Sequence, residues 1–191
     1  MDPTPTRDVE ALREVVRQGG RPKYLFFWGH QPRPGGSIGK TCFSQWFAAG
    51  FTLNDVYYPT AEHYMMAEKA RLFSDDAILA KILDAPHPGA AKKLGRQVRN
   101  FDHSAWREAR YPIVVKGNTA KFSQNEALGS FLLNTGQRVL VEASPVDRIW
   151  GIGLAADDPR AVDPELWQGL NLLGFALMEV RAVLRADNPT R

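Results

Sequence analysis

The sequence predicts an α+β fold, a helix-dominated single domain with one small β-sheet. Three observations lead to this prediction. With 191 residues and 44% hydrophobic side chains, the chain is long enough to bury one well-formed core. Several segments repeat apolar residues at intervals of three and four, which is the helical period. Runs typical of β-strands are few and short, which limits the sheet to a handful of strands.

The elements are predicted in order along the chain. Residues 1–22 are expected to form an N-terminal extension with a short helix over 8–18, stopped by Gly19-Gly20. Residues 23–186 are expected to form the main domain, and 187–191 a C-terminal tail. Strands are predicted at residues 24–28 and 139–142, and a hairpin at 51–53 and 56–58. Helices are predicted at residues 60–73, 75–83, 90–99, 104–111 and 125–133.

Two prolines mark the expected boundaries in the second half of the chain. Pro112 is expected to break or kink any helix that spans it, because proline lacks the N–H that a helix interior needs. Pro164 is expected to open a last long helix. Leucine and valine recur there at intervals of three and four, at Leu166, Leu170, Leu173, Leu177, Val180 and Leu184.

Composition narrows the function classes. The net charge of +3 and the pI near 9.1 permit an anionic ligand without requiring a nucleic acid. A single cysteine, Cys42, excludes an internal disulfide and fits a cytoplasmic protein. The sequence has no apolar run of about 18 residues, so no membrane span is expected. The four histidines lack metal-ligand spacing, and no metal or cofactor is expected.

Residues 35–43, GGSIGKTCF, look like a phosphate-binding P-loop at first sight. The pattern G-x-x-x-x-G-K-[ST] requires a glycine at position 34, where this sequence has Pro34. A P-loop also follows a buried strand and opens a long helix, whereas aromatic residues without helical period follow Thr41. The segment is therefore interpreted as a Gly-rich surface loop.

Residues 59–73, PTAEHYMMAEKARLF, carry the clearest functional signal. On a helical wheel, Glu62 and Lys69 lie within the apolar face, whereas His63 and Tyr64 lie opposite, where Tyr64 is interpreted as packing. Burying a charge costs several kcal/mol unless the charge is paired or functional. Seven residues of helix rise about 10.5 Å, which is long for a direct ion pair. A shared site is favoured over a buried structural pair, which remains the alternative.

A second cluster lies in residues 140–153, LVEASPVDRIWGIG. Asp147 offers a carboxylate, and Trp150 offers a flat face for stacking a base or a sugar ring. Gly151 and Gly153 permit a close approach of the backbone. A core tryptophan is the simpler interpretation of Trp150 alone, but its neighbours make a binding role equally reasonable.

Two shorter segments complete the candidates. The aromatic turn at residues 43–46, FSQW, presents Ser44, Gln45 and Trp46 to a ligand, with Phe43 assigned to packing. Residues 92–99, KKLGRQVR, group several cations on or near a helix, where they could bind phosphate or form a solvated face. Arg96 is the favoured phosphate ligand among them.

Taken together, these motifs resemble the signature of the NADAR family, also called YbiA-like. The central match is T-x-E-H-Y-x-x-A-x-K at residues 60–69. The other matches are F-S-Q-W at 43–46, K-L-G-R at 93–96, W-x-x-x-R at 106–110, K-F at 121–122, L-V-E through D-x-x-W-G-x-G at 140–153, and N-x-x-G-x-x-L-M-x-x-R at 171–181. The resemblance spans residues 24–183. It departs from the pattern at Gln45, where many members have asparagine.

The resemblance implies an N-glycosidase, a hydrolase that cleaves the bond between ribose C1 and a nitrogen. One branch of the family removes ADP-ribose from guanine bases of nucleic acid, reversing an ADP-ribosylation. Another branch cleaves phosphoribosylamino-pyrimidine intermediates of riboflavin biosynthesis. Both reactions build positive charge on the sugar, which a nearby carboxylate stabilises. The implied partner is thus an ADP-ribose-like or phosphoribosyl substrate, free or on ADP-ribosylated nucleic acid.

The resemblance and the residue chemistry together assign roles. Glu62 is the main catalytic carboxylate, with Asp147 as acid/base partner or ribose-hydroxyl ligand. Lys69 has two open roles, as an electrostatic stabiliser or as a nucleophile that forms a Schiff base with the opened ribose. The substrate-binding candidates are Ser44, Gln45, Trp46, Arg96, Trp150, Gly151 and Gly153. The alternatives are a non-catalytic ADP-ribose or NAD binding module and an interaction protein.

Overall fold

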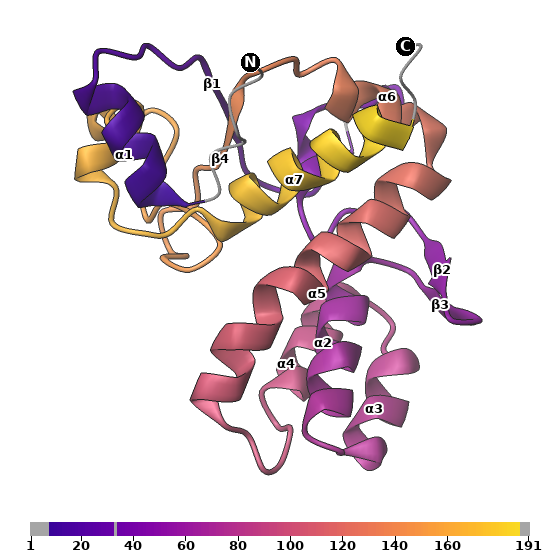
Figure 1. Cartoon of the computed structure of the whole chain (residues 1–191). Helices are drawn as coiled ribbons and strands as arrows, with labels where there is room; N and C mark the ends of the chain where they lie inside the picture. Colours follow the sequence, from indigo (N-terminus) through magenta and orange to yellow (C-terminus); the bar gives the residue numbers. More distant parts are fainter. Residues whose placement is uncertain (1–7, 33, 188–191) are drawn as a thin grey trace.

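The computed structural model describes residues 8–32 and 34–187 of the chain. Helices dominate this part of the chain, and short strands make up the remaining regular structure (Figure 1). The helices are α1 (Val9–Arg17), α2 (Ala61–Leu72), α3 (Asp76–Leu83), α4 (Pro88–Gly95), α5 (His103–Gln124), α6 (Glu126–Leu133) and α7 (Leu172–Asp187). The strands are β1 (Tyr24–Phe27), β2 (Phe51–Leu53), β3 (Val56–Tyr58) and β4 (Val139–Glu142). The predicted α+β class is confirmed.

The strands form two separate pairs rather than the one small sheet that was expected. β1 pairs with β4 in parallel, with Tyr24 opposite Val139 and Phe27 opposite Glu142. β2 and β3 form the predicted antiparallel hairpin. The β2 edge of this hairpin is bonded to α5 rather than to another strand. There, the Gln124 side chain accepts from the Thr52 N–H at 2.8 Å and donates to the Thr52 carbonyl at 2.8 Å.

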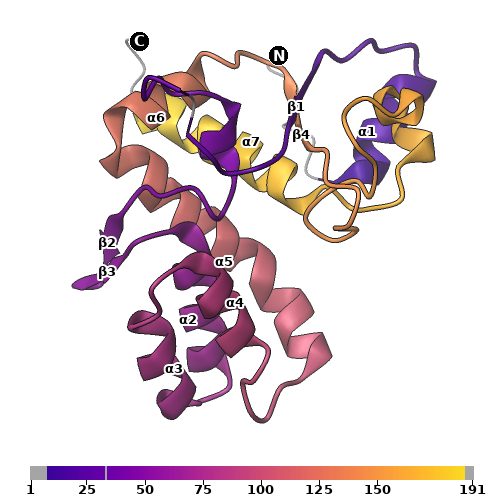
Figure 2. The ribbon, with the colours of Figure 1, turned by 180° about the vertical axis from the view of Figure 1, so that it is seen from behind.

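The helices form two groups that α5 joins. Figure 1 and the reverse view in Figure 2 show α2, α3 and α4 gathered beside the N-terminal half of α5. The C-terminal half of α5 crosses α7, and α7 in turn packs along β4. The end of β4 and the start of α2 therefore approach each other from opposite groups, and this arrangement makes room for a pocket between them.

α2 is buried on nearly all sides, which the helical wheel did not predict. His63 and Tyr64, assigned to the opposite face, are only 1% and 2% exposed. His63 Nε2 donates to the Ala85 carbonyl at 3.0 Å, so the ring fastens α2 to the segment before α4. Tyr64 packs edge-on against Tyr58 and Phe51, in agreement with its predicted packing role.

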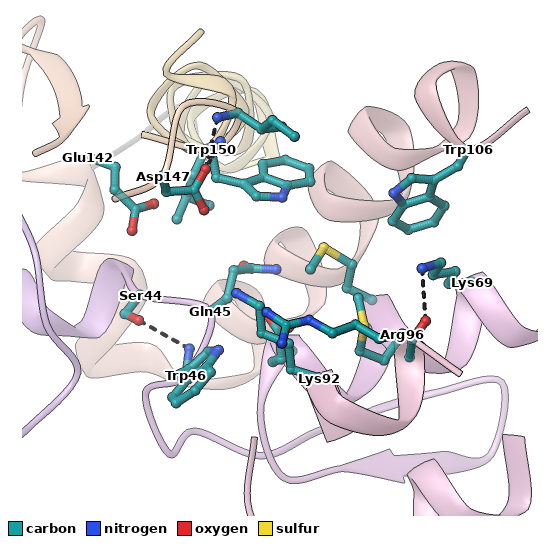
Figure 3. A pocket seen from close by; sticks show the side chains of 16 residues that line it. Ser44, Gln45, Trp46, Lys69, Lys92, Arg96, Trp106, Glu142, Asp147 and Trp150 are labelled. Atoms are coloured by element: carbon teal, nitrogen blue, oxygen red, sulfur yellow. Dashed lines mark hydrogen bonds between the residues drawn. The ribbon is translucent and has the colours of Figure 1, made fainter. Parts of the chain in front are cut away.

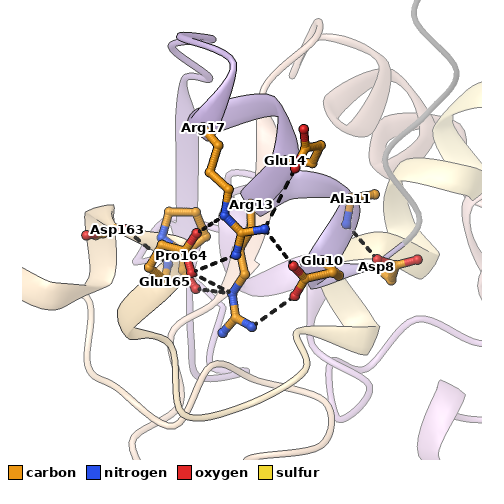
Figure 4. Close-up of polar contacts among 9 residues, drawn as sticks. All are labelled: Asp8, Glu10, Ala11, Arg13, Glu14, Arg17, Asp163, Pro164 and Glu165. Atoms are coloured by element: carbon orange, nitrogen blue, oxygen red, sulfur yellow. Dashed lines mark hydrogen bonds and ion pairs between the residues drawn. The ribbon is translucent and has the colours of Figure 1, made fainter.

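The N-terminal helix contacts the body of the protein through buried Leu12 and through polar contacts on its exposed side. Asp8 caps α1 by accepting from the Ala11 N–H at 2.8 Å. Arg17 pairs with Glu165 at 2.7 Å, and Arg13 Nε donates to the Pro164 carbonyl at 3.0 Å (Figure 4). These contacts place α1 against the 3-10 helix Pro164–Leu166.

The helix end expected at Tyr111 and the helix start expected at Pro164 were both wrong, while the kink expected at Pro112 stays a prediction. α5 continues through Pro112 instead of ending at Tyr111. Pro112 and Glu108, whose carbonyl loses its helical partner, are both exposed, so water can take the place of the missing bond. Pro164 opens only a three-residue 3-10 helix, and α7 begins at Leu172. The apolar spacing misled because Leu166 and Leu170 are 49% and 42% exposed rather than part of the core.

Residues 35–43, which were interpreted as a Gly-rich loop and not as a P-loop, do not have the structure of a P-loop. Residues 40–43 form a 3-10 helix of four residues that packs on β1, not the long helix that a P-loop opens. Phe43 is fully buried, as predicted.

Candidate active site

A cavity of about 360 Å³ lies between the two helical groups. Eight of the ten predicted site residues line it: Ser44, Gln45, Trp46, Glu62, Lys69, Arg96, Asp147 and Trp150. Figure 3 shows Glu142, Asp147 and Trp150 on one side, Lys69 and Trp106 on another, and Lys92 and Arg96 between them. The structure thus brings together residues from segments more than 100 positions apart in the sequence.

Glu62 lies in the first turn of α2 and is only 3% exposed. Its backbone N–H donates to the Gln45 carbonyl at 3.0 Å, which ties the aromatic turn to the start of the helix. Its Oε1 is buried without a hydrogen-bond partner. Burial raises the pKa of Glu62 to about 7, against the opposing influence of Lys92 and of the Trp46 side chain. The carboxyl therefore changes charge near neutral pH.

Lys69 lies two turns further along α2 and does not pair with Glu62. Its Nζ donates to the Gly95 carbonyl at 2.8 Å and sits 4.2 Å from the centre of the Phe101 ring. No ion pair joins Lys69 to a carboxylate within residues 8–32 and 34–187. The alternative of a buried structural pair is therefore excluded. Burial, reinforced by Arg96, lowers the pKa of Lys69.

The aromatic turn is held from behind by two buried residues of α5. Lys121 Nζ donates to the Cys42 carbonyl at 2.7 Å and to the Ser44 carbonyl at 2.9 Å. Asn118 Nδ2 donates to Gln45 Oε1 at 2.7 Å. This bond leaves the Gln45 amide nitrogen to face the cavity (Figure 3).

Asp147 organises the loop that carries Trp150. Its Oδ1 accepts from the backbone N–H groups of Ile149 and Trp150, each at 2.8 Å. Gly151 and Gly153 do not line the cavity. A side chain at Gly151 would meet the Glu142 carbonyl oxygen at 2.8 Å, and Gly153 has φ of +69°, so both glycines serve the close folding of this loop.

Of the eight lining residues that the sequence did not predict, three bear on the chemistry of the site: Glu142, Lys92 and Trp106. Glu142 ends β4, and its Oε2 is buried without a partner. Burial raises the pKa of Glu142 to about 8, with Asp147 and Glu62 adding to the effect. Lys92, passed over in favour of Arg96, opposes the raised pKa of both glutamates. Trp106 lies 5.6 Å from Lys69 Nζ, measured to the ring centre. The sequence signal that could have pointed to Glu142 was its position at the end of a predicted strand, within the cluster at residues 140–153.

Two further findings bear on the kind of site this is. Among the residues that the structure describes, no cluster of three or more His, Cys, Asp or Glu side chains is arranged to hold a metal ion. In the same part of the chain, no helix has the length and apolar character needed to cross a membrane.

The cavity combines shielded carboxyl oxygens with tryptophan side chains and with the cations Lys69, Lys92 and Arg96. Buried carboxyl groups can stabilise a cationic sugar and exchange protons with a leaving group or water. Tryptophan faces suit a flat base or ring, and cations suit phosphate.

Comparison with known proteins identifies the family. A model of the NADAR domain matches residues 26–185, and the chain belongs to this family. It is 44% identical over 164 residues to an N-glycosidase of Acanthamoeba polyphaga mimivirus, covering 83% of this chain and 95% of that protein. It is 30% identical over 145 residues to N-glycosidase YbiA of Escherichia coli, covering 76% and 82%. The NMR structure of E. coli YbiA superposes with a TM-score of 0.71 at 26% identity, over 90% of each chain. The protein is accordingly a hydrolase of the N-glycosidase class.

Proposed function

We propose that this N-glycosidase hydrolyses a ribose C1–N bond in one or both of two substrate classes. The first is ADP-ribose attached to guanine in nucleic acid. The second is a phosphoribosylamino-pyrimidine intermediate of riboflavin biosynthesis. The observation that carries the proposal is Glu62, whose shielded and unpartnered Oε1 lies in a cavity walled by tryptophan and flanked by cations. A cytoplasmic location stays a prediction from the single cysteine.

Glu62 supplies the negative charge in the proposed reaction. As the C1–N bond breaks, the ribose ring gains positive charge, and an adjacent carboxylate lowers the energy of that state. A carboxylate shielded from water acts more strongly than one in solvent because the local dielectric constant is lower. Since the pKa of Glu62 is raised to about 7, the ionised form is available from neutral pH upward.

Lys69 has two roles that its surroundings support. Its hydrogen bond to Gly95 and its contact with Phe101 favour a charged ammonium that attracts phosphate or the leaving base. Its lowered pKa favours a free amine that attacks C1 and forms a Schiff base with the opened ribose. Borohydride added during turnover separates them, because it reduces a Schiff base to a stable adduct on Lys69. The electrostatic role predicts no adduct.

The remaining wall residues are assigned to binding. Asp147 uses Oδ1 for its own loop, which suits Oδ2 to a ribose hydroxyl better than to proton transfer. Trp46 and Trp150 stack the base or the sugar. Arg96, which is exposed at the cavity, holds a phosphate. Ser44 and Gln45 set the shape of the wall, and the Gln45 amide nitrogen donates to the ligand.

One assay with two substrates tests the proposal. Purified protein is incubated with an oligonucleotide ADP-ribosylated on guanine and, separately, with the phosphoribosylamino-uracil intermediate. Loss of the ribosyl group is followed by mass spectrometry. Glu62→Gln is expected to lose turnover. Glu68→Gln, on the same helix but ion-paired with Arg71 outside the cavity, is the matched control and is expected to keep it.

The outcomes separate the candidate functions. Cleavage of the oligonucleotide alone assigns the protein to nucleic-acid de-modification, and cleavage of the small molecule alone assigns it to metabolite clearance. Binding of ADP-ribose by both wild type and Glu62→Gln, with no turnover of either substrate by the wild type, would refute catalysis. That result would favour the non-catalytic binding module.

A further inference from the structure

A second glutamate shares the cavity with Glu62 and comes from the opposite group of elements. Glu142 is the last residue of β4, and its backbone is fixed on both sides of the strand. On one side β4 pairs with β1, with Phe27 opposite Glu142. On the other side, the buried Asn171 side chain accepts from the Glu142 N–H and donates to the Leu140 carbonyl, both at 2.9 Å. The side chain of Glu142 is thereby aimed into the cavity.

Both glutamates keep an oxygen that no group of the described chain satisfies. Glu142 Oε2 and Glu62 Oε1 are each shielded from solvent and without a hydrogen-bond partner. Buried polar atoms are nearly always hydrogen-bonded, because an unpaired one is costly. Two unpartnered carboxyl oxygens in one cavity indicate a place where a ligand can hydrogen-bond to both carboxyls.

The charges around the two carboxyls are unequal. The charged groups that face them are Lys92 and Arg96 from α4, Lys69 from α2, Asp147 from the loop after β4, and Arg110 of α5, which faces Asp147. Asp147 raises the pKa of both carboxyls. Lys92 and Arg96 both lower the pKa of Glu62, whereas Lys92 alone lowers that of Glu142, which Glu62 raises further. When two neighbouring carboxyls cannot both ionise, the proton stays on the one with fewer cations nearby.

We propose that Glu142 is the proton donor of the reaction, paired with an ionised Glu62. This rests on the proposed cleavage of a ribose C1–N bond. As that bond breaks, its electron pair moves onto the leaving nitrogen, and Glu142 transfers its proton to that nitrogen or to an atom conjugated with it. Glu62 faces the cationic sugar. Water then adds to C1 and gives a proton back to Glu142, so the enzyme returns to its starting state. The products are the unmodified leaving base, which stays in its nucleic acid in the first substrate class, and the released sugar, as ADP-ribose or ribose phosphate.

Asp147 is the competing carboxylate, and its contacts favour another task. Its Oδ1 is occupied by two backbone N–H groups that shape the Trp150 loop. Removing Asp147 is therefore expected to disturb the loop and binding. Glu142 makes no side-chain hydrogen bond within residues 8–32 and 34–187, so an isosteric change there removes little more than the acidic proton.

The test compares Glu142→Gln with wild type on two substrates that have the same sugar and the same type of base and differ in how easily the base leaves. One base leaves poorly unless it is protonated, and the other carries an electron-withdrawing substituent and leaves without a proton. General acid catalysis typically contributes 10²–10⁴-fold. Glu142→Gln is expected to lower kcat/KM roughly 10²-fold or more on the first base and less than about 10-fold on the activated base. Its pH profile is expected to lose the alkaline limb that wild type shows, because in wild type the donor proton is lost as pH rises.

Each outcome decides a different claim. An equal loss of kcat/KM on both bases would show that Glu142 has only a structural role. Unchanged kcat/KM on the unactivated base would show that Glu142 takes no part in the reaction. Either result overturns the donor role while leaving N-glycosidase activity in place. A wild type that cleaves neither base overturns the proposed substrate reaction itself, and the donor role with it. Activity of Glu142→Gln on the activated base also verifies that the variant is folded.

Discussion

Replacing Lys121 by methionine is expected to change stability in a way that depends on pH. Lys121 is fully buried in α5, and its Nζ donates to the carbonyls of Cys42 and Ser44. No ion pair to Lys121 occurs in the described part of the chain. Burial lowers its pKa to about 7, from an ordinary value of 10.5. Methionine matches its length and apolar stem but has neither the charge nor the donors.

The magnitude follows from the difference in pKa between the folded and unfolded chains. Between pH 7 and 10.5 the unfolded chain holds a proton on Lys121 that the folded protein has released, so the contribution of Lys121 to stability rises with pH. Each unit of pKa difference is worth about 1.4 kcal/mol. From pH 7 to pH 9, the stability lost on Lys121→Met should therefore grow by about 2 kcal/mol. It should level off about one unit below pH 7, where Lys121 is protonated in both states.

A second effect adds to this one at every pH. The variant leaves two buried carbonyl oxygens without their donor, which costs about 1–3 kcal/mol for each unsatisfied group. At pH 9, where wild-type Lys121 is neutral and still donates both bonds, the loss should be largest. The carbonyls belong to the segment that carries the aromatic turn, so the same variant is also expected to weaken substrate binding.

Urea unfolding of wild type and variant at pH 7, 8 and 9 measures the difference directly. The other titrating groups, including Glu62 and Glu142, act on both proteins and cancel when the two are compared. Exposed Lys116 on the same helix provides the control, because Lys116→Met should change stability by less than about 0.5 kcal/mol at all three pH values. A stability difference for Lys121→Met that does not vary with pH would refute the reasoning.

Three further predictions follow from the packing and charge of the site. Gly174→Ala would press a methyl group onto the Leu140 carbonyl oxygen, and it should destabilise the protein by about 1–3 kcal/mol in urea unfolding; unchanged stability would contradict this packing. Lys92→Met removes the cation that most opposes the raised pKa of Glu62, so the acid limb of the kcat/KM profile should move to higher pH by roughly one unit. An unmoved limb would show that Lys92 does not influence the pKa of Glu62. Trp46→Ala should weaken binding by about 1–3 kcal/mol per stacked base, read as a raised KM; a change in kcat alone would argue against stacking.

Local sequence signals predicted most elements because their capping and periodicity were unambiguous. The predicted helix at residues 60–73 corresponds to α2, where the Thr60 hydroxyl caps the start by accepting from the His63 N–H at 3.3 Å. The last helix was placed eight residues too early because apolar spacing alone does not show what a side chain packs against. Asn171 has a φ of +52°, which is not helical, so the helix does not extend back past it. Its side chain instead hydrogen-bonds to the edge of β4.

The sequence predicted most of the residues that form the site, but it did not predict which of them are protonated or which charges act on each other. Glu62 and Lys69 were placed together by the helical period, and the cavity does contain both. Their surroundings could not be read from the sequence, because Gly95 and Phe101, which contact Lys69, and Glu142, which lines the cavity, come from other elements. The balance between two carboxyls depends on which cations face each of them. That is a property of the packing of α2 and α4 against the end of β4, and only the folded chain defines it.

Three ionisable groups shielded from water, two of them on buried residues and one on the half-buried Glu142, are hard to explain by stability alone. Glu62, Lys121 and Glu142 each have a pKa moved towards neutrality by burial, which means that folding pays to bring each out of water. An apolar residue at each position would remove that cost. Lys121 recovers part of it through two carbonyl bonds, whereas the glutamates keep unpartnered oxygens. The cost at Lys121 is thus partly offset by contacts within the protein, whereas no hydrogen bond in the described part of the chain offsets it at the two glutamate oxygens.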